Sequence, residues 1–115
     1  MNLTVDTPIE KSFLALPPIE RATIIRHGVA LRLSDLRKRL FLAESKVQLL
    51  ETKYNTSLAK LDSEGLPDDA GVEMHEDYIM WHHWTEAAQK ARSELSSLEE
   101  IERQGLWVME RRHAG

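Results

Sequence analysis

The sequence predicts an all-α protein, a long antiparallel two-helix hairpin of coiled-coil-like character preceded by a short helix. Three observations predict it: an apolar repeat with alternating steps of four and three, a second apolar stripe with helical spacing, and one cluster of turn-forming residues between them. The first stripe consists of Val29, Leu33, Leu36, Leu40, Ala43, Val47, Leu50, Tyr54, Ser57 and Leu61. Such a seam is typical of a helix that packs along another helix.

The 115 residues are expected to form a single helical-hairpin domain, 1–115, that opens with a short helix over about 8–15. Thr7 can cap this helix, and Glu10 completes a capping box. Two prolines end it, and the first long helix follows over about 18–63. Gly28 costs that helix about 1 kcal/mol relative to alanine, so continuity through this position stays open.

Residues 64–71 combine glycine, proline and acidic turn formers, and they predict the hairpin loop. The second long helix is predicted over about 72–104, with Gly105 as its stop. We expect the tail, 105–115, either to fold back on the base of the hairpin or to extend as a strand on a partner's sheet edge. The apolar stripe of the second helix consists of Met74, Tyr78, Trp81, Trp84, Ala88, Ala91, Leu95, Leu98 and Ile101.

The two stripes also predict a register. Antiparallel pairing about the loop requires facing positions to add up to roughly 134, which sets Leu50 against Trp84 and Ala43 against Ala91. Large residues then face small ones, or leucines face leucines, as close packing requires. A hairpin has much surface for its volume, so we expect a second copy to cover the remaining apolar residues and form a helical bundle. These are chiefly Leu31, Phe41, Leu42, Leu49, Ile79 and Met80.

Composition excludes several classes of function. The absence of cysteine excludes disulfides, thiolate metal sites and cysteine nucleophiles. The N-terminus lacks the pattern of a signal peptide, and no apolar run is long enough to span a membrane, so we expect a cytoplasmic protein with no membrane partner. No glycine-rich phosphate loop and no nucleophile–base set is evident. We therefore predict a non-enzyme with no catalytic residues and no cofactor.

Charge is distributed unevenly around a formal net charge of -4. No lysine or arginine occurs from Leu61 to Gln89, a segment that holds eight carboxylates. Aromatic residues in this segment suit a core or a dimer interface better than a stacking platform for bases, which needs cations nearby. The predicted partner-binding residues are Asp68, Asp69, Glu73, Glu76, Asp77, Trp81 and Trp84.

Two alternatives concern other chemistry. His75 and His82 lie seven residues apart on one helical face, and two paired copies would collect them with Glu76 or Glu86 in a metal-binding bundle, although the spacing of a single-turn histidine chelate is absent. The run that includes Arg32, Arg37, Lys38 and Arg39 has the charge density of a phosphate-binding helix, but long helices commonly carry such residues on solvated faces, and nucleic acid is the less favoured partner.

The run Leu-Leu-Glu-Thr-Lys-Tyr (49–54), the acidic Gly-Leu-Pro-Asp-Asp turn (65–69) and His-Glu-Asp-Tyr-Ile-Met-Trp (75–81) together resemble a class of small prokaryotic helical-hairpin proteins. Members of this class resemble antitoxin components of toxin–antitoxin pairs, in which the hairpin binds a small toxin-like protein. The resemblance covers about residues 30–102. It implies that the acidic tip or the aromatic face meets a small basic toxin. The chain departs from the class pattern by the inserted residues 70–72 and shows no DNA-binding segment of the kind antitoxins use.

Overall fold

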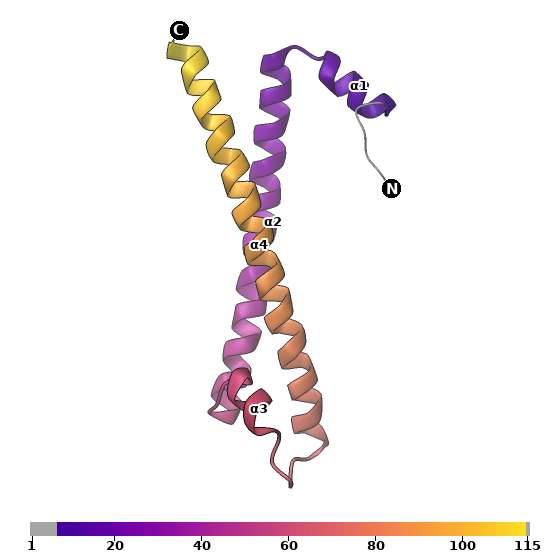
Figure 1. Ribbon diagram of the computed structural model, residues 1–115, viewed down its shortest axis with the longest axis vertical. Coiled ribbons are helices and arrows are strands. Elements are labelled where there is room, and N and C mark those ends of the chain that lie inside the picture. Colours follow the sequence, from indigo (N-terminus) through magenta and orange to yellow (C-terminus); the bar gives the residue numbers. More distant parts are fainter. Residues whose placement is uncertain (1–6, 115) are drawn as a thin grey trace. The chain divides into compact units, whose positions relative to one another are not determined.

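The described part of the chain is entirely helical. The computed structural model describes the backbone of residues 7–114 and the side chains of residues 7–104. No strand occurs in that part, and the long helices pack together as an antiparallel pair, which confirms the all-α prediction. The elements are α1 (Pro8–Ala15), α2 (Pro18–Tyr54), α3 (Leu58–Glu64) and α4 (Val72–Ala114) (Figure 1).

The chain divides into two compact units. One comprises residues up to Leu33 together with those from Ser97 onward, and the other comprises Ser34–Ser96. In the first unit, Thr7 caps α1 by accepting a hydrogen bond of 3.2 Å from the backbone N–H of Glu10. The guanidinium of Arg21 on α2 donates to the carbonyl of Leu14 at 3.3 Å. α1 buries none of its side chains.

Helix α2 is continuous through Gly28. A methyl group at this position would meet no atom within 4 Å, so the glycine is not required by a close approach of another segment. The question that the sequence leaves open at Gly28 is thereby answered: the helix tolerates the glycine without a break.

The predicted first long helix of 18–63 is wrong in its second part, because α2 ends at Tyr54 and a separate helix, α3, follows. Asn55 has a φ of 50°, the left-handed conformation that asparagine adopts more readily than most residues. Ser57 then caps α3 by accepting from the N–H of Lys60 at 3.2 Å. Two strong local signals, an asparagine stop and a serine cap, outweigh the apolar repeat here.

The unit of Ser34–Ser96 holds most of the core. Its buried residues come from all three helices: Leu36 and Ala43 from α2, Leu61 from α3, and Trp81, Ala88, Ala91 and Leu95 from α4. Both alanines predicted to face each other, Ala43 and Ala91, are buried. Beside them Glu44 and Arg92 form an ion pair of 2.9 Å, within about two positions of the predicted register.

Helix α4 runs on to Ala114, so the predicted end at residue 104 is wrong. Gly105 costs an α-helix about 1 kcal/mol, and the long-side-chain helix formers that follow it offset that cost. The helical backbone also rules out the predicted strand for this tail. The side chains of 105–115, and with them the predicted fold-back contacts, lie outside the described residues, as do residues 1–6. None of the described helices is long and apolar enough to cross a membrane.

Candidate functional site

The candidate site is the hairpin tip, where α2 ends, α3 and the loop follow, and α4 begins. Two carboxylates on different helices each collect hydrogen bonds from a neighbouring helix there. We call them the Asp77 cluster (Lys53, Tyr54, Glu73 and Asp77) and the Asp62 cluster (Asp62, Tyr78 and His82).

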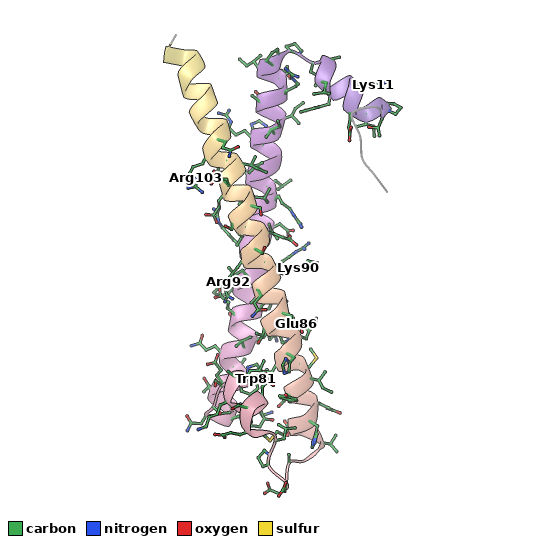
Figure 2. The ribbon with its side chains drawn as sticks, viewed as in Figure 1. Lys11, Trp81, Glu86, Lys90, Arg92 and Arg103 are labelled. Atoms are coloured by element: carbon green, nitrogen blue, oxygen red, sulfur yellow. The ribbon has the colours of Figure 1, made fainter. Side chains whose placement is uncertain are left out.

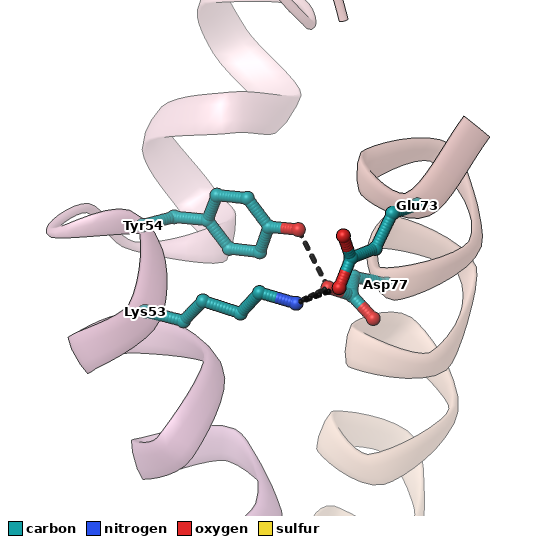
Figure 3. Close-up of polar contacts among 4 residues, drawn as sticks. All are labelled: Lys53, Tyr54, Glu73 and Asp77. Atoms are coloured by element: carbon teal, nitrogen blue, oxygen red, sulfur yellow. Dashed lines mark hydrogen bonds and ion pairs between the residues drawn. The ribbon is translucent and has the colours of Figure 1, made fainter. Parts of the chain in front are cut away.

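In the Asp77 cluster, the last two residues of α2 reach across to the first turns of α4 (Figure 3). The ammonium of Lys53 lies 2.7 Å from a carboxylate oxygen of Glu73 and 2.7 Å from one of Asp77. The hydroxyl of Tyr54 donates to the same oxygen of Asp77 at 2.5 Å. Hydrogen bonds from Lys53 and then from Tyr54 hold the pKa of Asp77 below its usual value, and the same carboxylates raise the pKa of Lys53.

In the Asp62 cluster, α3 is attached to α4. A carboxylate oxygen of Asp62 accepts from the hydroxyl of Tyr78 at 2.5 Å and lies 2.8 Å from Nε2 of His82. These bonds, that from Tyr78 first, lower the pKa of Asp62, and the bond to Asp62 raises the pKa of Tyr78. The ring of His82 also meets the ring of Tyr78 edge-on, with centroids 5.0 Å apart.

Trp81 lies in the core of the tip, on α4 one residue before His82 (Figure 2). Its side chain is 1% exposed and stacks against Tyr54 at a centroid distance of 6.1 Å. Its burial favours the core interpretation of the aromatic stripe, and a role of Trp81 in partner binding stays a prediction. Trp84 is half-buried, with its ring edge-on to that of His83.

The predicted acidic residues fall into two groups. Asp77 is half-buried and Glu73 is exposed, and both are bonded to Lys53. Asp68, Asp69 and Glu76 are exposed, and none has an ion pair with a described side chain. The sequence reasoning missed this division because the neutralising lysine precedes the cation-free segment and comes from the other helix. A lysine–tyrosine pair directly before an asparagine helix stop is the signal that would have located it.

The geometry gives little support to the two alternative predictions, the metal site and the phosphate-binding helix. Nδ1 of His75 lies 2.9 Å from the carbonyl oxygen of Gly71, and His82 is bonded to Asp62. Within residues whose side chains are described, no group of three or more histidine or carboxylate side chains is arranged to hold a metal ion. Of the basic run, Arg39 is paired with Asp35 at 3.1 Å, and Arg37 and Lys38 are exposed.

No protein-family model matches the chain, and no curated protein and no solved structure shows significant similarity to it. The residues at the tip are therefore the basis of the functional argument.

Proposed function

We propose that this chain is a non-catalytic protein–protein interaction module, a homodimer that binds a small basic protein through the acidic tip of its hairpin. One observation carries the proposal. Of the carboxylates at the tip, Glu73 and Asp77 share an ion pair with Lys53 of the same chain, while Asp68, Asp69 and Glu76 face solvent without an ion pair to a described side chain. Unpaired surface carboxylates attract a cationic partner and raise its rate of association.

The loop that carries two of these carboxylates is held by the structure around it. The N–H of Gly65 donates to the carbonyl of Leu61 at 2.7 Å, and that of Ala70 donates to Pro67 at 3.0 Å. The two clusters fix the flanking helices. A charged loop that is ordered before binding loses less conformational entropy when it meets its partner, which favours affinity.

The homodimer is supported by the apolar surface. All six residues expected to lie outside the seam are exposed. The most exposed side chains are Leu31, Phe41 and Ile79, at 76%, 74% and 67%. Large exposed apolar side chains in this number are typical of a surface that is covered by another chain.

The resemblance to antitoxin components gives the proposal its more specific form. In that form the partner is a small basic toxin, whose nucleic-acid-binding surface the carboxylates would occupy. The module would act in the cytoplasm, without a cofactor and without nucleic acid or membrane as its own ligand.

The test uses the protein encoded by the adjacent gene as the probe, with affinity measured by isothermal titration calorimetry. The triple variant Asp68→Asn, Asp69→Asn, Glu76→Gln should bind about tenfold more weakly, since each exposed ion pair contributes up to about 1 kcal/mol. The matched control carries the same charge change at other exposed positions: Glu51→Gln, Glu86→Gln, Glu99→Gln. Equal affinity for both variants, or no binding by the unmodified protein, contradicts the proposal.

A further inference from the structure

Helix α3 is held in place by few contacts. It has seven residues, and Leu61 is the only one of them that is buried. Its polar attachment to α4 is made by Asp62, which accepts from the hydroxyl of Tyr78 at 2.5 Å and lies 2.8 Å from Nε2 of His82. One buried apolar side chain and one carboxylate are therefore the principal attachments of α3.

Both ends of this segment have the backbone geometry of a hinge. In the part of the chain that the structure describes, positive φ values occur at Asn55 (50°) and Gly65 (80°), which bracket residues 56–64. Few residues other than glycine and asparagine adopt this conformation readily, so the chain direction is set locally at these two points. A change of backbone dihedrals at the two residues can move α3 without moving α2 or α4.

The apolar repeat of α2 offers residues 55–64 a second place in the fold. Tyr54 stacks on Trp81, so the two residues lie at one level of the hairpin. Seven residues farther toward the tip, the repeat on α2 reaches Leu61 and the stripe on α4 reaches Met74, which is half-buried. If α2 continued as a helix, Leu61 would therefore lie on the seam opposite Met74.

The hairpin can accommodate this longer helix. A continuous α2 that ended at Glu64 would leave residues 65–71 to reach Val72, the first residue of α4. Connections of about two to eight residues are usual between neighbouring helices. Two forms of the tip therefore compete. The helix stop, the serine cap and the bonds of Asp62 favour the broken form, and the apolar repeat favours the continuous one.

We propose that α3 is a strap with two positions, and that a basic partner selects the open position, in which residues 55–64 join α2 as one helix. In the closed position Asp62 is bonded to α4, and Leu61 lies in the core of the tip. Opening frees the carboxylate of Asp62 and removes Leu61 from the core that contains Trp81. The open form thus offers a cationic side chain one more carboxylate and an aromatic ring.

The inference rests on the proposed function and adds its regulation. A ligand shifts an equilibrium only through its different affinities for the two forms, and its apparent affinity is reduced by the fraction of chains that are open. Variants that weaken the closed form should therefore bind the partner more tightly, although they lose a native contact. A purely structural role of α3 predicts no such gain.

The first experiment measures affinity for the protein encoded by the adjacent gene, by isothermal titration calorimetry. Tyr78→Phe removes one bond to Asp62 and should tighten binding about fivefold, the usual equivalent of one hydrogen bond. The matched control is Tyr54→Phe, the same chemical change in the Asp77 cluster, where α3 takes no part. It should bind no more tightly than the unmodified protein. Weaker or unchanged binding by Tyr78→Phe overturns the inference.

Position 55 supplies two variants of opposite sign. Asn55→Ala disfavours the positive φ and favours a helix, so it should tighten binding about fivefold. Asn55→Gly retains the break and disfavours a helix, so it should weaken binding about twofold or more. The side chain of Asn55 is exposed, so neither variant removes a buried contact. Equal affinities of the two variants contradict a partner that selects the continuous helix.

The second experiment needs no partner. The triple variant Asn55→Ala, Ser57→Ala, Asp62→Ala lacks the helix stop, the cap and the bonds to α4. Its Cα chemical shifts in NMR spectra should take helical values throughout residues 55–59, whereas Asn55→Gly should keep the interruption of the unmodified protein. All three positions are exposed, so circular dichroism should show that the rest of the fold is retained. Shifts that stay non-helical in the triple variant overturn the inference.

The outcomes separate this inference from the proposed function. A chain that binds no basic protein overturns the proposed function, and the chemical shifts still decide whether the strap opens. Weaker binding by the variant of the three tip carboxylates, together with unchanged binding by Tyr78→Phe, supports the tip as the binding site and overturns the strap.

Discussion

Asp77 on α4 accepts a hydrogen bond of 2.5 Å from the hydroxyl of Tyr54, the last residue of α2. Because Lys53 also bonds to Asp77, two consecutive residues at the end of one long helix hold one carboxylate in the second turn of the other. The contact fixes where α2 stops relative to where α4 starts, and the exposed loop carboxylates lie between these two points in sequence.

Tyr54→Phe should lower the free energy of unfolding by about 1 kcal/mol, the usual contribution of one hydrogen bond, since the ring and its stacking on Trp81 are kept. Chemical denaturation followed by circular dichroism measures the change. The control is the same substitution in an Asp77→Asn background, where the charged acceptor is already gone. Its effect there should be clearly smaller; equal effects in both backgrounds would show that the two side chains do not interact.

Both tyrosines of the chain should titrate above their ordinary pKa. The hydrogen bond to Asp77 raises the pKa of Tyr54, and the hydrogen bond to Asp62 raises that of Tyr78. A group whose pKa is raised by folding stabilises the fold below its unfolded pKa, here about 10, and loses that contribution as pH rises through the folded value. Tyrosinate absorbance of the folded protein should therefore rise at higher pH than that of the protein in denaturant; coincident curves contradict the hydrogen bonds.

The carboxylates of the same clusters predict how the stability of the protein changes at acidic pH. Hydrogen bonds from Lys53 and Tyr54 lower the pKa of Asp77, and bonds from Tyr78 and His82 lower that of Asp62. Depressed values mean that the stabilisation is present above the unfolded pKa of about 4 and is lost as pH falls through the folded values. The midpoint temperature of thermal unfolding should decrease as the pH is lowered below about 4. This decrease should be less steep in Asp77→Asn than in the unmodified protein.

Elements with a dominant local or periodic signal were predictable. The two stripes indicate that two long helices pair, and the small residues Ala43 and Ala91 of these stripes are both buried. The glycine, proline and aspartate cluster determines the loop. In these places pattern and capping chemistry agree, so one conformation is favoured at both levels.

The site was harder to predict because its parts compete or lie far apart in sequence. At Asn55 the apolar repeat favours a continuing helix, while Asn55 itself and the capping Ser57 favour a stop, and the local signals prevail. Lys53 and Asp77 are 24 residues apart, and their pairing depends on that stop. When charges are counted along the sequence, Asp77 falls in a segment without cations. Such a count cannot show that Lys53 lies opposite Asp77 in the folded chain.

Asn55 offers a direct test of the helix break. Its φ of 50° is strained for most residues and unstrained for glycine, and the residue is exposed. Asn55→Gly should leave stability within about 0.5 kcal/mol or raise it, whereas Asn55→Val should lower it by about 1–2 kcal/mol. Thr52→Val, at an exposed position inside α2, is the control for β-branching and should have little effect. If Asn55→Val lowered the free energy of unfolding no more than Thr52→Val does, the result would indicate that α2 continues past Tyr54 in solution.

We expect a substitution at Thr85 to stabilise the fold. Its Oγ1 is buried without a hydrogen-bond partner, as is Nε1 of Trp81 one turn before it. Thr85→Val replaces the hydroxyl by a methyl group of similar size, so it removes the cost of burying an unpaired polar atom and should raise the free energy of unfolding by about 1 kcal/mol. The matched control is Thr23→Val, whose hydroxyl donates to the carbonyl of Ile19 at 2.8 Å, and which should not gain stability. A loss of stability in Thr85→Val as large as about 1 kcal/mol would mean that the hydroxyl has a hydrogen-bond partner in solution, such as a buried water shared with Trp81.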